Sequence, residues 1–98
     1  MEPGLDRQQW EAEMSALEEQ LTASPDESLP ELDELVGRML RDAEVEDPEV
    51  VAEYDAAHEI TEALERGAEG LSPGDVGAAV NGYRAVYEHI VSALDRAS

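Results

Sequence analysis

The chain has no lysine, no cysteine and no phenylalanine, and its 98 residues include only one tryptophan and three tyrosines. Six arginines face 25 aspartates and glutamates, which gives a formal net charge of −19. Proteins that bind nucleic acid gain most of their affinity from Lys and Arg side chains that neutralise phosphates. The charge balance therefore argues against direct contact with nucleic acid, and equally against docking on an anionic membrane.

The absence of cysteine excludes disulfide bonds, thiolate metal sites and a cysteine nucleophile. It fits a reducing cytoplasm, which is the location that we expect. The first ten residues, MEPGLDRQQW, lack the basic and apolar regions of a signal peptide. No apolar run approaches the ~20 residues that a membrane-spanning helix needs.

Hydrophobic residues make up 42% of the chain, as in ordinary globular proteins, so the acidity does not indicate wholesale disorder. The length predicts a single domain over residues 1–98. Two properties of the host could explain the charge: a GC-rich coding bias that favours Arg over Lys, or adaptation to high salt. A specific functional role for the acidity is the third explanation, and the sequence leaves all three open.

Hydrophobic periodicity predicts four helices, at residues 6–22, 29–45, 48–66 and 73–96. In the first segment Trp10, Met14, Leu17 and Leu21 form one narrow stripe, which suits a single neighbouring helix from the same chain or from a second copy. Short polar connections between the segments predict an all-α fold, a small four-helix domain resembling an up-down bundle.

The second helix has two competing start signals. Ser28 can cap a helix whose first residues include Pro30, with Glu31 reaching back to the cap. Ser24 and Pro25 offer a rival start, which we disfavour because Pro30 would then lie inside the helix.

The third and fourth helices have clearer signals. Asp47 precedes a proline at the first helical position, and Ser72 and Asp75 have the spacing of a capping box. In the fourth helix, Gly77 and Gly82 lower helix propensity but let another backbone come close.

Candidate catalytic or metal-binding residues are few. Asp55 and His58 have the i, i+3 spacing of carboxylate-bridged metal bundles, but the residue three before His89 is Val86, so the second half of the pattern is missing. We identify no inward-facing carboxylate, nucleophile elbow or phosphate-binding loop. The sequence therefore predicts no enzyme activity, no cofactor and no metal site.

Interface anchors are the remaining candidates. Tyr and Arg side chains often anchor protein interfaces, although the same tyrosines could fill a core poor in aromatic residues. The candidate interface residues are Trp10, Met14, Leu17, Leu21, Tyr83, Arg84 and Tyr87. The expectation is a non-catalytic protein that acts through protein–protein association, with a homodimer as the predicted assembly. The alternatives are an acidic mimic of nucleic acid that occupies a basic groove of a partner, and a carboxylate/His metal-binding bundle.

Overall fold

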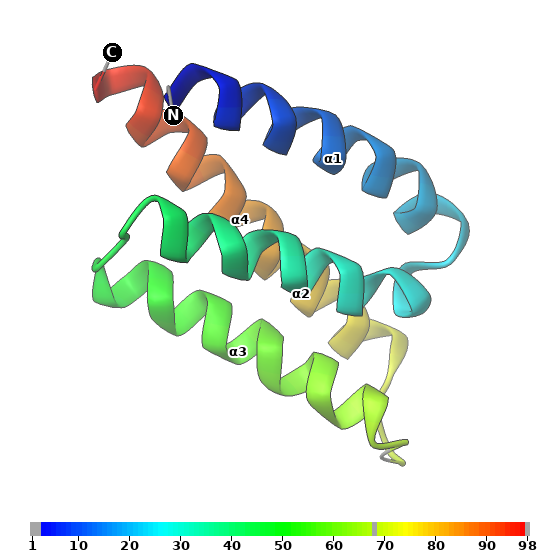
Figure 1. The fold of residues 1–98 in the computed structure, drawn as a ribbon. Coiled ribbons are helices and arrows are strands. Elements are labelled where there is room, and N and C mark those ends of the chain that lie inside the picture. The colour runs from blue at the N-terminus through cyan, green and yellow to red at the C-terminus, as the bar shows by residue number, and fades with distance from the viewer. Residues whose placement is uncertain (1–2, 68, 98) are drawn as a thin grey trace.

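The computed structural model describes the backbone of residues 3–67 and 69–97, and the side chains of residues 8–67 and 69–93. Within these residues the chain forms four α-helices and no strand: α1 (Pro3–Ala23), α2 (Pro25–Asp42), α3 (Pro48–Glu65) and α4 (Pro73–Ala97). Consecutive helices run in opposite directions (Figure 1). The prediction of a small all-α, four-helix domain is confirmed.

The helices form two layers. α1, α2 and α3 lie side by side, and α4 crosses behind them (Figure 1). The molecule measures 44 × 28 × 18 Å, and its smallest dimension matches two stacked helices of ~10 Å diameter each. α4 packs mainly on α2 and α3, whereas α1 rests mainly on α2 and, among the described residues, has no packing contact with α3.

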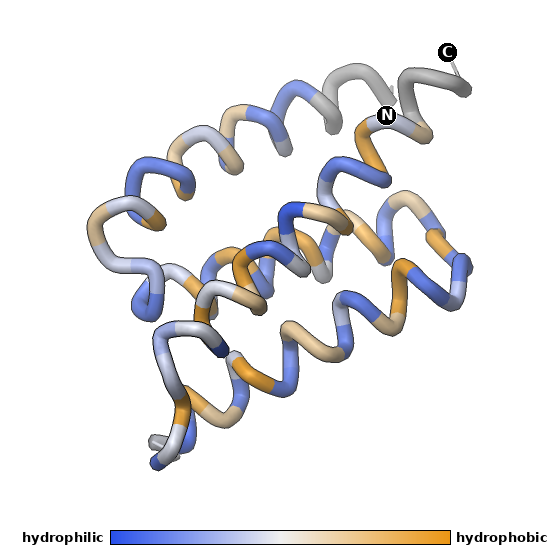
Figure 2. The backbone as a smooth tube through the Cα atoms, turned by 180° about the vertical axis from the view of Figure 1, so that it is seen from behind, coloured by the Kyte–Doolittle hydropathy of each residue, from blue (hydrophilic) through white to orange (hydrophobic). Residues whose placement is uncertain are grey.

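The core lies between these layers. Hydrophobic and hydrophilic residues alternate in short groups along each helix, as an amphipathic bundle requires (Figure 2). The central helix α2 buries Leu29, Leu32, Leu35, Val36 and Met39 almost completely. The other helices contribute the remaining buried apolar side chains: Trp10, Met14, Leu17, Leu21, Val50, Ala57, Ala79, Val80, Tyr83, Val86 and Ile90.

The predicted start of the second helix is wrong. α2 begins at Pro25 with Ser24 as its N-cap, so Pro30 lies inside the helix. Pro30 lacks the N–H that would bond to the carbonyl of Asp26, but Asp26 is exposed in the first turn, where water can replace that bond. The early start buries Ser28 and Leu29, and burying a leucine stabilises the fold by about 1.5–3 kcal/mol.

The predicted end of the second helix is also wrong, because α2 stops at Asp42. Glu44 has φ of 53°, the left-handed conformation usually taken by glycine at this position. The Glu44 amide donates to the Arg41 carbonyl at 3.2 Å, and the Val45 amide donates to the Leu40 carbonyl at 3.1 Å. These two bonds define a Schellman motif, which closes the helix without its usual glycine.

The predicted starts of the third and fourth helices are confirmed. The Asp47 carboxylate accepts a hydrogen bond from the Glu49 amide at 2.9 Å. Ser72 and Asp75 form the reciprocal capping box, with N–H···O distances of 3.0 and 3.2 Å. No helix in the described part of the chain combines the length and the hydropathy that a bilayer crossing requires.

Gly82 of α4 lies at a close approach, as predicted. A Cβ on Gly82 would lie 3.4 Å from Ala57 Cβ and 3.5 Å from the Glu53 carbonyl oxygen, so α3 and α4 meet there. For Gly77 the prediction is wrong, because a Cβ there would have no heavy atom within 4 Å among the described residues.

Candidate functional site

The carboxylate of Asp33 lies between three helices and is the centre of a polar cluster. Its Oδ1 accepts a hydrogen bond from the Tyr54 hydroxyl at 3.0 Å. Its Oδ2 accepts one from the Tyr83 hydroxyl at 2.5 Å and lies 2.6 Å from His58 Nδ1. The Asp33 side chain is only 16% exposed, so these donors replace most of the water that would otherwise solvate its charge.

Tyr83 extends the cluster into the core. Its hydroxyl lies 2.6 Å from Thr61 Oγ1, and the single Thr61 proton can be donated to Tyr83 or to the Ala57 carbonyl, whose oxygen lies at 3.0 Å. Tyr83 and Thr61 are almost completely buried. We call Asp33, Tyr54, His58, Thr61 and Tyr83 the Asp33 cluster; it joins α2, α3 and α4.

His58 contacts two carboxylates at once. Nδ1 lies against Asp33 at 2.6 Å, and Nε2 lies 2.9 Å from Glu62 Oε1. Ionised carboxylates only accept hydrogen bonds, so both contacts are hydrogen bonds when the ring is an imidazolium. The hydrogen bond with Asp33 accordingly raises the pKa of His58 above 6.5, although partial burial opposes that shift.

The tyrosines of the cluster stay protonated. Burial raises the pKa of Tyr54 to about 12, and the charge of Asp33 and the hydrogen bond to it act in the same direction. Burial and the bond to Asp33 also raise the pKa of Tyr83. Both hydroxyls therefore remain hydrogen-bond donors throughout the physiological pH range.

Local sequence explains how the cluster is assembled. Tyr54, His58 and Thr61 recur at spacings of four and three, so they share one face of α3. The Tyr54 ring stacks on His58 with centroids 5.6 Å apart and meets Tyr83 edge-on at 6.0 Å. Gly37 leaves room for the Tyr54 hydroxyl, because a Cβ at that position would lie 2.9 Å from it.

The expectation of no inward-facing carboxylate is wrong, and Asp33 is the residue that it missed. Asp33 precedes Val36, Gly37 and Leu40 by three, four and seven positions, so it shares a helix face with apolar and small residues. That spacing could have indicated that the Asp33 side chain faces the core. The His58 side chain lies at the edge of the cluster and is 39% exposed.

The described residues contain no group of three or more His, Asp or Glu side chains arranged to hold a metal ion. Asp33 accepts from Tyr54 and Tyr83 and contacts His58, and each ring nitrogen of His58 contacts a carboxylate. The contacts within the cluster therefore stabilise the packing of three helices, and none of them points to a bound substrate.

The structure buries most of the candidate interface residues within the chain itself. Trp10, Met14, Leu17 and Leu21 pack into the common core, with α1 on α2. Tyr83 belongs to the Asp33 cluster. Arg84 is partly exposed and bonds to Glu18 of α1 through Nε at 3.2 Å and Nη2 at 3.4 Å. Tyr87 is also partly exposed and packs against the core.

An apolar pocket opens at the end of the bundle where α3 ends and α2 and α4 begin. Its volume is about 430 Å³, and Leu64, Leu71 and Val76 remain partly exposed on its walls. We call it the end pocket; the residues that line it are Pro25, Asp26, Leu64, Leu71, Ser72, Pro73, Val76 and Gly77.

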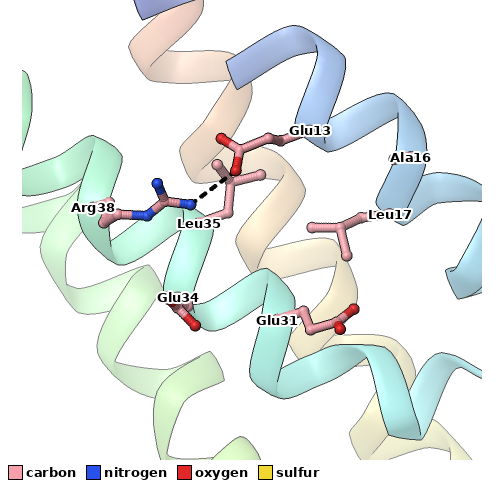
Figure 3. Close-up of a pocket in the computed structure, with 7 residues that line it drawn as sticks. All are labelled: Glu13, Ala16, Leu17, Glu31, Glu34, Leu35 and Arg38. Atoms are coloured by element: carbon pink, nitrogen blue, oxygen red, sulfur yellow. Dashed lines mark hydrogen bonds and ion pairs between the residues drawn. The ribbon is translucent and has the colours of Figure 1, made fainter. Parts of the chain in front are cut away.

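A second pocket of about 330 Å³ lies between α1 and α2 (Figure 3). Arg38 reaches from α2 to Glu13 on α1, with Nη2 and Oε1 3.1 Å apart, while Leu17 and Leu35 form the apolar part of the wall. Glu13 Oε2 and Arg38 Nε are buried and have no hydrogen-bond partner among the side chains that the structure describes. Because both side chains are more than a third exposed, the pair contributes only about 0–1 kcal/mol to stability.

Neither a family model, nor a curated protein, nor a solved structure matches this chain.

Proposed function

We propose that this protein is a non-catalytic binding module that associates with a basic protein partner through the end pocket. The observation that carries this proposal is a pocket of about 430 Å³ with partly exposed leucine and valine walls on a chain of net charge −19. A cytoplasmic location is part of the proposal.

The pocket favours an apolar side chain from the partner. Leu64, Leu71 and Val76 retain contact with water, and covering them would release about 25 cal/mol for each Å² of apolar surface removed from it. Anchors of this kind, set in a pocket and surrounded by polar residues, carry much of the affinity of protein interfaces. The volume of about 430 Å³ is enough for one or two side chains.

The charge favours a basic partner over a second copy of the chain. Two copies would each contribute −19 to the complex, whereas Arg- and Lys-rich segments would be attracted and their association accelerated. α1 begins and α4 ends at the other end of the bundle, away from the end pocket (Figure 1).

Gly77 provides a variant that blocks the pocket. It lines the pocket, and a Cβ there would touch nothing within 4 Å, so Gly77→Leu should place a side chain in the space that the anchor would occupy. Ala78→Leu is the matched control, because Ala78 is exposed on the same helix and does not line the pocket.

The test uses two fluorescent peptides of equal length and equal positive charge, one with a single leucine and one without. Fluorescence anisotropy should give tighter binding of the leucine peptide to the wild-type protein. Gly77→Leu should remove that preference, and Ala78→Leu should keep it. Higher salt should weaken both peptides.

Equal binding of both peptides would contradict a role for the pocket and would favour the alternative of an acidic mimic that recognises charge alone. No binding of either peptide at low salt would contradict association with a basic partner. The homodimer remains a separate prediction, which concerns the faces of α1 and α4 rather than the end pocket.

A further inference from the structure

The Asp33 cluster lies at the joint between α2 and α3, where direct packing is limited. α3 packs mainly on α4, and α2 packs mainly on α4 and α1, whereas direct packing between α2 and α3 is more limited. Across this joint the described side chains form two polar links, from Tyr54 and from His58, and both end on Asp33.

We propose that His58 and Asp33 form a pH-operated clamp that holds α3 on α2 while His58 is an imidazolium and loosens when the ring loses its proton. The device is independent of the proposed partner and of the end pocket.

Loss of the proton changes the contacts in a defined way. A neutral imidazole has a single N–H, so one of its two nitrogens would present a lone pair to a carboxylate, either Asp33 or Glu62. Asp33 would then keep its hydroxyl donors but lose the cation beside it, in a position where its side chain is only 16% exposed. An uncompensated charge at such a position weakens the packing around it.

The groups that face His58 favour the charged form of its ring. From α2 the facing group is Asp33; from α3 they are Asp55, Glu62 and Tyr54; and α4 contributes Tyr83 through its bond to Asp33. The three acidic groups all favour the charged ring. The pKa values of both tyrosines are raised, so neither changes charge near neutral pH. His58 is thus the group within the cluster that titrates in that range.

The direction of the pH effect follows from the raised pKa of His58. Its contribution is fully present below the unfolded-state value of 6.5 and is lost as the pH rises through the higher folded-state pKa. The clamp therefore opens on the alkaline side.

Loosening of the contact between His58 and Asp33 would affect the protein surface through Tyr54. This residue belongs to the cluster and also lines a groove of about 480 Å³ between the end of α2 and the start of α3, together with Gly37, Leu40 and Val51. A looser joint between α2 and α3 would change the shape of this groove.

The test compares thermal unfolding of wild type, His58→Gln and His89→Gln between about pH 6 and about pH 9. Glutamine donates a hydrogen bond but cannot be charged. The gap in Tm between wild type and His58→Gln should be largest at the acidic end and should shrink as the pH rises. His89→Gln should run parallel to wild type, because His89 lies on α4 outside the cluster.

Two further measurements distinguish a clamp from a general loss of stability. NMR titration of the His58 ring should give a lower midpoint in Asp33→Asn than in wild type. Amide hydrogen exchange, compared between wild type and His58→Gln at one acidic pH, should increase at the joint of α2 and α3 more than in α1. A Tm gap that is constant with pH, or a His58 midpoint that Asp33→Asn leaves unchanged, overturns the proposal.

Discussion

At the scale of single residues, the contact between Gly37 and Tyr54 decides whether the Asp33 cluster can form. The Tyr54 hydroxyl lies where a Cβ on residue 37 would come within 2.9 Å of it, and the same hydroxyl donates to Asp33. The ring has little freedom to retreat, since it stacks on His58 and meets Tyr83 edge-on.

Gly37→Ala should therefore destabilise the protein, although alanine is the better helix former by about 1 kcal/mol. A hydrogen bond to a charged group is worth about 1.5–3 kcal/mol, so the net loss should be about 0.5–2 kcal/mol in urea unfolding. Gly77→Ala is the control, because its Cβ meets nothing within 4 Å, and it should stabilise.

The Tyr54→Phe variant provides a second test of the steric conflict between residue 37 and Tyr54. In Tyr54→Phe the hydroxyl is absent, so Gly37→Ala should change from destabilising to neutral or stabilising. If the two glycine substitutions had the same effect in the wild-type background, the proposed steric conflict with Tyr54 would be absent.

At the scale of helices, the sequence predicts those boundaries that have ordinary signals. Asp47 with Pro48, and Ser72 with Asp75, mark the starts of α3 and α4 because each side chain caps the backbone that follows it. α2 departs from the prediction at both ends: burial of Leu29 outweighs the cost of Pro30, and Glu44 takes a glycine conformation. Tertiary packing determines where α2 starts. The end of α2 could not be predicted because its C-cap lacks the usual glycine.

The candidate site was less predictable than the helices, for a related reason. A carboxylate such as Asp33 normally indicates a solvated face, and its burial depends on three donors from two other helices, Tyr54 and His58 on α3 and Tyr83 on α4. Those contacts join residues 21 to 50 positions apart, and helical periodicity describes only neighbours within one helix.

The end of α2 gives a prediction of its own. Glu44→Gly should raise the unfolding free energy by about 1 kcal/mol, because glycine takes the left-handed conformation without the steric cost of a Cβ. Urea unfolding measures the change. Glu44→Ala removes the same charge but keeps a Cβ, so its gain should be the smaller of the two, and an equal gain would mean that charge rather than backbone strain dominates.

At the scale of the whole molecule, the net charge of −19 acts on the stability of the fold. Like charges repel in the compact state, and salt reduces the range of that repulsion from ~10 Å at 0.1 M to ~3 Å at 1 M. Tm from circular dichroism should therefore rise with NaCl. Among the described residues, the partly exposed pairs Arg38–Glu13 and Arg84–Glu18 oppose the effect only weakly, since each contributes about 0–1 kcal/mol.

An equal ionic strength of LiCl should give a similar rise, because screening depends on ionic strength. A Tm that stays flat or falls in both salts would contradict self-repulsion as a determinant of stability.

Charge also bears on the predicted homodimer. The apolar stripe of α1 is buried within the chain, so a two-fold contact would have to use the remaining faces of α1 or α4 and overcome repulsion between two acidic copies. Sedimentation equilibrium should give a mass near the monomer value of 10.7 kDa at low salt and a concentration-dependent increase at moderate salt. A constant mass near 10.7 kDa in both conditions would exclude the homodimer.

Because α1 lies at the edge of the front layer, the fluorescence of its tryptophan can report on the packing of this helix. The one tryptophan of the chain, Trp10, is on this helix and only 6% exposed, whereas all three tyrosines lie on α3 and α4. Indole emission shifts to longer wavelength when the ring enters water, so tryptophan fluorescence reports the docking of α1 separately from the other three helices. In a urea titration we expect this shift to precede the loss of helical circular dichroism. The reason is that α1 packs mainly on α2 and has few contacts with α4. Coincident transitions would instead mean that α1 unfolds together with the rest of the bundle.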